Sequence, residues 1–256
     1  MSNLITILAT LGLALILPGC AGERTITPGM AHQKKNDNLC AAVVSHNARM
    51  VAVAIRRGAD PRSWCYLEGG QDSTPFKALF EKRGNFRPAL KALINGGLPL
   101  NEPSLGTVPL FGALEICRLD VAQYLVSLGA NPRLRPKQAS QSDIWEAVFA
   151  CNKDPVQAVR WVLSLGVSKK GAGFMPATFL AAQKLYHRSF EVLIRARAPW
   201  KPFYDGQLGK VTIEGQTLFM INSCMQDMKC MNFKDLVARR QKIFQAMRRQ
   251  GLPVDN

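Results

Sequence analysis

The feature that most constrains this chain is a short motif that recurs along it. In its full copies an apolar helical stretch ends in Gly-Ala, then Asp or Asn, then Pro. Glycine after a helix adopts the left-handed conformation that ends it, and proline cannot continue the helix. Such recurrence predicts a tandem array of similar units. The full copies are Val51–Pro61 and Val121–Pro132, and the looser ones are Leu93–Pro99, Trp161–Val167, Val192–Pro199 and Phe244–Pro253.

A second short apolar helix is expected upstream of each copy. Two such segments are Thr74–Leu79 and Val108–Ala113, and each has a proline at its second position. Proline in the first helical turn costs no hydrogen bond and presets φ. The spacing is regular, because Asp37 precedes Gly58 by 21 residues and Val108 precedes Gly129 by the same 21. The sequence therefore predicts repeated helix pairs.

The segments Thr-Pro-Phe-Lys-Ala and Val-Pro-Leu-Phe-Gly-Ala resemble the Thr-Pro-Leu-His-x-Ala signature of ankyrin repeats. The resemblance covers roughly residues 37–254. It implies an all-α fold, a curved ankyrin-repeat solenoid of about six helix pairs. The second, fourth and sixth pairs are degenerate, and the sixth has an insertion around residues 226–232. The alternative is an ordinary all-α bundle with glycine-capped helices.

The N-terminus carries a targeting signal. Residues 4–17 form a nearly unbroken apolar run of 14 residues. A bilayer span needs about 20 residues, whereas a secretory h-region has roughly 7–15. The following Leu17-Pro18-Gly19-Cys20 resembles a bacterial lipobox, although Pro18 is unusual there and no Lys or Arg precedes the run. An uncleaved signal anchor and a plain signal peptide remain alternatives.

The lipobox resemblance implies a domain organisation and a location. Residues 1–19 are the expected lipoprotein signal peptide, and Cys20 is the expected lipidated residue. Because Ala21 rather than Asp follows Cys20, the resemblance implies sorting to the periplasmic side of the outer membrane. Residues 20–36 show no helical period and are expected to be a flexible tether. Residues 37–256 form the expected repeat domain.

Six cysteines remain besides Cys20, and an exported protein can pair them as disulfides. Cys117 and Cys151 occupy the same position in adjacent units, in the turn between the two helices. Cys224 and Cys230 flank the insertion in the last unit. These four are the candidate disulfide cysteines, whereas Cys40 is expected to be a small buried residue of a first helix. The alternative is that all six are reduced packing residues.

The sequence contains no recognised catalytic motif. It has only three histidines, no His-Glu-x-x-His and no Gly-x-Ser-x-Gly. We therefore expect a protein that is not an enzyme, has no cofactor or metal site, and does not bind nucleic acid. The net charge of +15 favours acidic proteins, phosphates or anionic lipid headgroups as partners. It is equally compatible with a solvated basic face that keeps the protein soluble.

The connections between units combine aromatic and basic residues, the types enriched at interface hot spots. Ankyrin proteins bind partners through such connections and the adjoining first helices, so the resemblance implies a basic concave binding surface. The alternative is that the aromatics fill gaps and the cations are merely solvated. The candidate protein-binding residues are Arg62, Trp64, Tyr66, Arg133, Arg135, Lys137, Lys169, Lys170, Phe174, Trp200, Lys201, Phe203 and Tyr204.

A lipid-anchored periplasmic repeat protein resembles the immunity proteins that neutralise type VI secretion lipase effectors. The resemblance implies a protein that binds an incoming phospholipase-type effector at the membrane and inhibits it. Two alternatives stay open. One is a periplasmic ankyrin scaffold that organises an envelope complex, and the other is an accessory factor for envelope stress or metal defence.

Overall fold

A computed structural model describes residues 28–66, 72–103, 108–134, 143–170, 175–201, 203–205, 209–226 and 233–254. The chain is predominantly helical, as predicted for an all-α protein. No helix in these described ranges is long and apolar enough to cross a bilayer. The expected signal peptide, the candidate lipidation site Cys20 and residues 21–27 lie outside the described residues.

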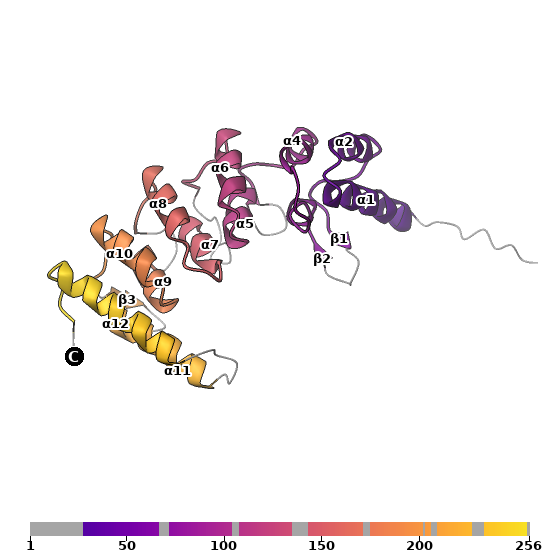
Figure 1. Ribbon diagram of the computed structural model, residues 1–256. Helices are drawn as coiled ribbons and strands as arrows, with labels where there is room; N and C mark the ends of the chain where they lie inside the picture. The colour runs from indigo at the N-terminus through magenta and orange to yellow at the C-terminus, as the bar shows by residue number, and fades with distance from the viewer. Residues whose placement is uncertain are drawn as a thin grey trace, which may run out of the picture.

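The helices follow one another as pairs, and Figure 1 shows the pairs side by side in chain order along a bent array. The first helix of each pair lies inside the bend and the second lies outside, most clearly from α5 to α10. The first helices are α1 (Pro28–Val44), α3 (Pro75–Ala78), α5 (Pro109–Glu115), α7 (Ile144–Ala150), α9 (Ala177–Gln183) and α11 (Ile213–Gln226). The second helices are α2 (Ala48–Arg56), α4 (Arg87–Asn95), α6 (Leu119–Ser127), α8 (Val156–Ser164), α10 (His187–Arg195) and α12 (Phe233–Arg249).

One continuous core runs between the two layers of helices. Its largest fully buried side chains are Trp145, Phe149, Phe179 and Phe190, which come from α7, α9 and α10. Helices pack chiefly on the equivalent helices of neighbouring pairs, for example α5 on α7 and α10 on α12. Each pair therefore buries its apolar faces against its neighbours rather than within itself alone.

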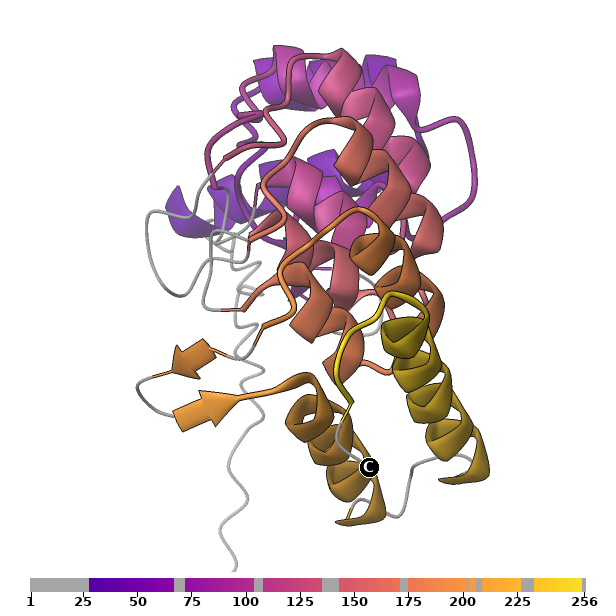
Figure 2. The same cartoon turned by 90° about the vertical axis from the view of Figure 1, so that its left-hand side faces the viewer.

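Two short antiparallel hairpins depart from the purely helical prediction. Strand β1 (Cys65–Tyr66) pairs with β2 (Asp72–Ser73), and β3 (Phe203–Asp205) pairs with β4 (Gly209–Val211). Both hairpins lie in connections that leave a second helix, after α2 and after α10, and Figure 2 shows β3 and β4 standing away from the helices. Aromatic residues such as Tyr66 and Phe203 favour this extended conformation.

The expected tether is wrong at its C-terminal end, because α1 already begins at Pro28. Proline suits the first position of a helix, since it has no N–H to satisfy there. Asn36 is buried, and its side-chain oxygen accepts a hydrogen bond from the backbone N–H of Asp60 at 3.0 Å. The polar stretch before Leu39 lacks an apolar period, so periodicity alone could not detect this part of the helix.

The second helices end as the repeated glycine predicts. Gly58, Gly97, Gly129, Gly166 and Gly251 all have positive φ, between 66° and 107°. The fifth pair lacks the glycine, and Arg197 takes the same left-handed conformation with φ 56°. A side chain with a Cβ atom is strained in this conformation by roughly 1–2 kcal/mol.

We expect Arg197→Gly to raise the free energy of unfolding by about 0.5–1 kcal/mol. It relieves the left-handed strain, and the extra freedom of glycine in the unfolded chain offsets part of the gain. Urea unfolding followed by circular dichroism measures the change. The matched control is Gly129→Ala, where an added Cβ meets no atom within 4 Å, so its expected loss of about 1 kcal/mol reports backbone conformation alone. An unchanged or lower stability of the Arg197 variant contradicts the assignment.

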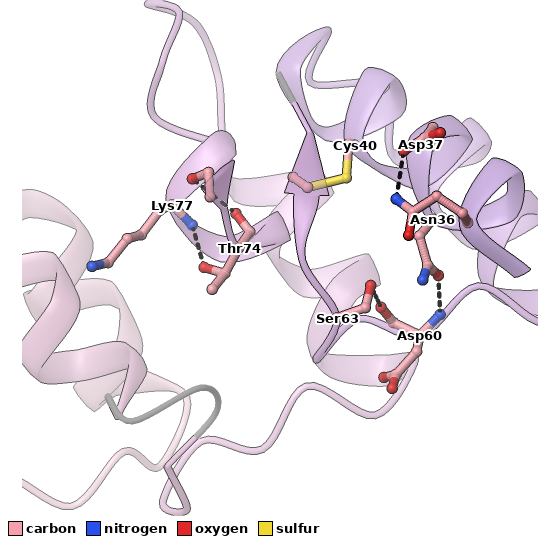
Figure 3. Close-up of a disulfide and its surroundings, with 10 residues drawn as sticks. Asn36, Asp37, Cys40, Asp60, Ser63, Thr74 and Lys77 are labelled. Atoms are coloured by element: carbon pink, nitrogen blue, oxygen red, sulfur yellow. Dashed lines mark hydrogen bonds between the residues drawn. A yellow bond between two sulfur atoms is a disulfide. The ribbon is translucent and has the colours of Figure 1, made fainter. Parts of the chain in front are cut away.

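Two disulfides join elements that are distant in sequence. Cys117 and Cys151 link the inter-helix turns of the third and fourth pairs, with Cα atoms 5.3 Å apart, in keeping with their shared position in the repeat. Cys40 links α1 to Cys65 in β1, with Cα atoms 5.6 Å apart, as Figure 3 shows. The sequence did not predict this second pairing. The candidate cysteines Cys224, as a side chain, and Cys230 lie outside the described residues.

Candidate protein-binding surface

The connections between pairs are shaped by the Asp or Asn of the repeated motif. A side-chain oxygen of Asp60 accepts the backbone N–H of Arg62 at 2.8 Å, and that of Asn131 accepts the N–H of Arg133 at 2.9 Å. Both are Asx turns, in which the side chain closes the turn in place of the backbone. Figure 3 shows the surroundings of Asp60, whose backbone also bonds Asn36 and Ser63. The motif thus fixes how the chain leaves each second helix.

Three of the predicted binding cations bridge to the next pair. Arg62 Nε donates to the carbonyl of Gly97 at 3.3 Å, and an Arg133 guanidinium N–H donates to the carbonyl of Leu165 at 3.0 Å. Lys169 Nζ donates to the carbonyl of Ala196. Each acceptor lies at the C-terminal end of a second helix, where carbonyls lack partners and the helix dipole favours a cation. These cations therefore position neighbouring pairs as well as contributing charge.

Asn101 forms a bridge of the same kind, but it was not among the residues predicted from the sequence. It stands four residues after Gly97, as Arg62 stands after Gly58. Its Nδ2 donates to the carbonyl of Gly129 at 3.2 Å, and its Oδ1 accepts the N–H of Asn131 at 2.7 Å. The signal that could have revealed it is this fixed spacing from the preceding glycine.

The predicted aromatic residues divide into an exposed and a packed group. Trp64 is 46% exposed, whereas Trp200 is half-buried and packs against the core. Tyr66 lies in β1, and Phe203 and Tyr204 lie in β3, with their side chains outside the described residues.

The remaining predicted binding residues are either exposed or outside the described residues. Lys170 and Lys201 are exposed in the connections after α8 and α10. Arg135, Lys137 and Phe174 lie outside the described residues. We define the connection surface as those of the predicted binding residues that are described and exposed, which are Arg62, Trp64, Arg133, Lys170 and Lys201.

Trp64→Ala and Trp200→Ala should separate binding from stability. We expect Trp64→Ala to change the free energy of unfolding by less than about 0.5 kcal/mol, because most surface substitutions are that mild. Trp200→Ala should cost about 2 kcal/mol, because its ring packs on the core. Thermal unfolding of the two variants beside the parent measures both. A large loss from Trp64→Ala would show that its ring supports the fold instead of being free for a partner.

Two grooves lie away from the connection surface. One, of about 340 Å³, runs between α1 and α2 and is lined by small apolar residues such as Ala41 and Ala54. The other, of about 290 Å³, lies beside the disulfide of Cys117 and Cys151. Small-molecule sites are enclosed, mostly apolar cavities. Neither of these grooves is lined by residues of the connection surface.

The expectation of a basic concave surface is wrong in its placement of the charge. The first helices, inside the bend, carry three Lys or Arg and four Asp or Glu. The second helices, outside it, carry thirteen Lys or Arg and only three Asp or Glu. First helices are flanked by neighbours on both sides and consist mainly of small and apolar residues, so charge gathers where the helices face solvent.

Polar side chains also join the fourth pair to the fifth. Asp154, in the turn before α8, accepts hydrogen bonds from the backbone N–H groups of Arg188 at 3.1 Å and Ser189 at 3.2 Å, and from the Ser189 hydroxyl. It therefore caps the N-terminus of α10 in the next pair. Tyr186 donates its hydroxyl to the carbonyl of Cys151 at 2.6 Å, and burial is the main cause that raises the pKa of this phenol.

The described residues contain no cluster of three or more His, Cys, Asp or Glu side chains that could hold a metal ion. The surface that the geometry offers is thus the connection surface, held in place by the Asx turns and the bridging cations. Comparison of the chain with known proteins finds no matching family model and no similar curated protein.

Proposed function

We propose that this protein is an exported, lipid-anchored ankyrin-type repeat protein that binds and inhibits a toxic secreted effector of the phospholipase type. It would act on the periplasmic side of the outer membrane, as an immunity protein. The observation that carries the proposal is the connection surface, whose exposed aromatic and basic residues come from the connections that follow α2, α6, α8 and α10.

Rigidity of the connections supports a binding role. Two connections, after α2 and after α6, are held at fixed positions. Each has an Asx turn, at Asp60 or Asn131, and a bridge to another pair, from Arg62 or Arg133. A partner that binds such a surface loses less free energy to ordering than one that must order free loops. The exposed ring of Trp64 is of the residue type that most often dominates binding energy.

The cysteines support an oxidising compartment. Disulfides form and persist in exported proteins and are rare in the reducing cytosol. The described residues contain two disulfides, and each joins segments at least 25 residues apart. Together with the lipobox resemblance at Cys20, they favour a periplasmic protein held at a membrane. An anchor there concentrates an inhibitor at the surface that a lipid-degrading effector attacks.

Affinity purification of the full-length, lipidated protein from envelope extract, at low and moderate salt, tests the proposal. We expect one secreted hydrolase at a 1:1 ratio, with its activity on phospholipid vesicles lost in the complex. A connection variant, Trp64→Ala with Lys170→Ala and Lys201→Ala, should lose this partner. A matched variant with three exposed second-helix residues changed, Lys91→Ala, Gln157→Ala and Arg160→Ala, should retain it.

Two results would contradict the proposal. Recovery of resident envelope proteins from every culture would favour the scaffold alternative. A captured hydrolase that stays fully active would show binding without inhibition.

A further inference from the structure

The last two second helices form a basic face at the C-terminal end of the array. Helices α10 and α12 pack against each other. The cations that they expose define the basic end face: Arg188, Arg195, Lys234, Lys242, Arg248 and Arg249. Four of these six cations come from α12, which as a whole contains six Lys or Arg against one acid, more than any other second helix.

The exposed cations of α12 lie away from the side of the helix that packs on the core. Its core side is formed by Leu236, Ile243 and Met247, which recur at intervals of seven and four residues. With 3.6 residues per turn, this spacing places Lys234 and Lys242 on the opposite side, facing solvent. The helix therefore carries an apolar stripe toward α10 and α11 and a basic stripe outward.

Nearby acids leave the end face strongly positive. Glu191 pairs with Arg195 at 2.6 Å and also lies 3.8 Å from Arg249. Asp235 pairs with Arg239 at 2.7 Å. These are the only two acids within α10 and α12, against eight Lys or Arg in the same helices. The excess of Lys and Arg over acids in these two helices gives this end of the array a positive charge that attracts anions.

A partly buried histidine lies beside these cations. His187, at the start of α10, has its pKa lowered first by burial and then by Lys242, with Arg239 and Arg188 acting in the same direction. Only Asp154 opposes them. Besides burial, the neighbouring cations thus disfavour the protonated, positively charged form of this imidazole.

We infer that the basic end face binds the phosphate groups of anionic lipids in the membrane that Cys20 anchors. The inference rests on the proposed lipid anchor. A 17-residue helix spans about 25 Å. Neither of the two grooves described above is lined by residues of α12, so the basic end face matches a wide anionic surface such as a bilayer better than a small anion. Lys and Arg residues close to a bilayer are attracted by the negative surface potential of anionic lipids.

The consequence is attachment at two points. In Figure 1, α1 and α12 lie at opposite ends of the array. A lipid near α1 and a basic face on α12 would hold the array along the bilayer instead of letting it project on its tether. The connection surface would then meet an effector at the membrane surface.

Lysine footprinting of the full-length, lipidated protein tests this inference. The protein is incorporated into vesicles of phosphatidylcholine alone or of phosphatidylcholine mixed with phosphatidylglycerol, an anionic lipid. Acetylation with a water-soluble reagent is then followed by mass spectrometry. We expect Lys234 and Lys242 to be labelled about five-fold more slowly on the anionic vesicles, whereas Lys91 and Lys170 are labelled equally on both. Equal labelling of all four lysines overturns the inference.

Arginine variants keep the two reporter lysines and sharpen the test. Arg188→Gln, Arg248→Gln and Arg249→Gln together should abolish the protection of Lys242. The matched change of three exposed arginines elsewhere, Arg56→Gln, Arg83→Gln and Arg160→Gln, should preserve it. Protection lost equally in both variants would indicate a general charge effect and contradict a specific face.

The same spectra separate this inference from the proposed anchor. A diacylglyceryl-modified Cys20 with an unprotected end face refutes only the membrane contact. An unmodified Cys20 refutes the anchor, and the unlipidated protein is then floated with anionic and neutral vesicles. Binding to anionic vesicles that 0.5 M salt releases supports the end face, and binding to neither kind overturns it.

Discussion

Cys117→Ala with Cys151→Ala is expected to lower the free energy of unfolding by about 3–4 kcal/mol. The disulfide closes a segment of 34 residues between two helix pairs, and its removal restores that segment's freedom in the unfolded chain. For a domain of this size the loss corresponds to a melting temperature lower by about 10 °C. Differential scanning calorimetry of the variant beside the parent protein measures it.

Cys40→Ala with Cys65→Ala is the comparison for this effect. Its segment of 25 residues predicts a loss only slightly smaller than that of the longer one, so both double variants should be destabilised to a similar extent. Mild reduction of the parent protein should reproduce the combined loss. Unchanged melting after complete reduction would show that neither bond stabilises the array, and would weaken the case for an oxidising compartment.

Phe149→Ala is expected to cost about 3–5 kcal/mol, the range for removing a large side chain from a packed core. Phe149 is 1% exposed, and its ring lies 6.5 Å from that of Trp145 and 6.3 Å from that of Tyr186. It therefore packs the fourth pair against the fifth. Because each pair of such an array is stabilised mainly by its neighbours, the loss should fall on this interface.

Two controls test whether the effect of Phe149 comes from core packing. Phe149→Leu should cost less than half as much, because most of the volume is kept. Ile116→Ala, at a side chain that is 36% exposed, should cost less than about 0.5 kcal/mol. Hydrogen exchange should show faster opening of α7 to α10 in the alanine variant. A loss below about 1 kcal/mol for Phe149→Ala would contradict the packing described.

Much of the fold could be predicted because its determinants are local. Gly58 and Gly129 end helices by their own backbone freedom, and Pro75 and Pro109 begin them. The alternation of short apolar helices then follows from spacing. The positions of Cys117 and Cys151 could be placed in neighbouring turns because the repeat carries a constant register.

What could not be predicted depends on contacts between distant residues. The pairing of Cys40 with Cys65 requires the hairpin after α2 to fold back on α1. The bridge from Arg62 to Gly97 requires the relative position of two pairs, which spacing does not give.

The predicted position of the positive charge, on the concave side, was wrong for a related reason. Composition reports the net charge of +15 but not which helix layer bears it. Only the arrangement in space shows that the second helices carry most of it, away from the first helices. The candidate binding residues could therefore be chosen from the residue types of the connections. The distribution of charge between the two helix layers could be described only from the structure.

The most direct test of the central claim is photo-crosslinking in intact cells. A photoreactive phenylalanine analogue replaces Trp64 on the connection surface or, in the matched experiment, the exposed Gln157 on the second helix α8. We predict one adduct with a secreted phospholipase from position 64, formed only in cells that meet the effector, and none from position 157. An adduct from position 157 alone, or the same resident envelope protein from position 64 in every culture, would contradict the account.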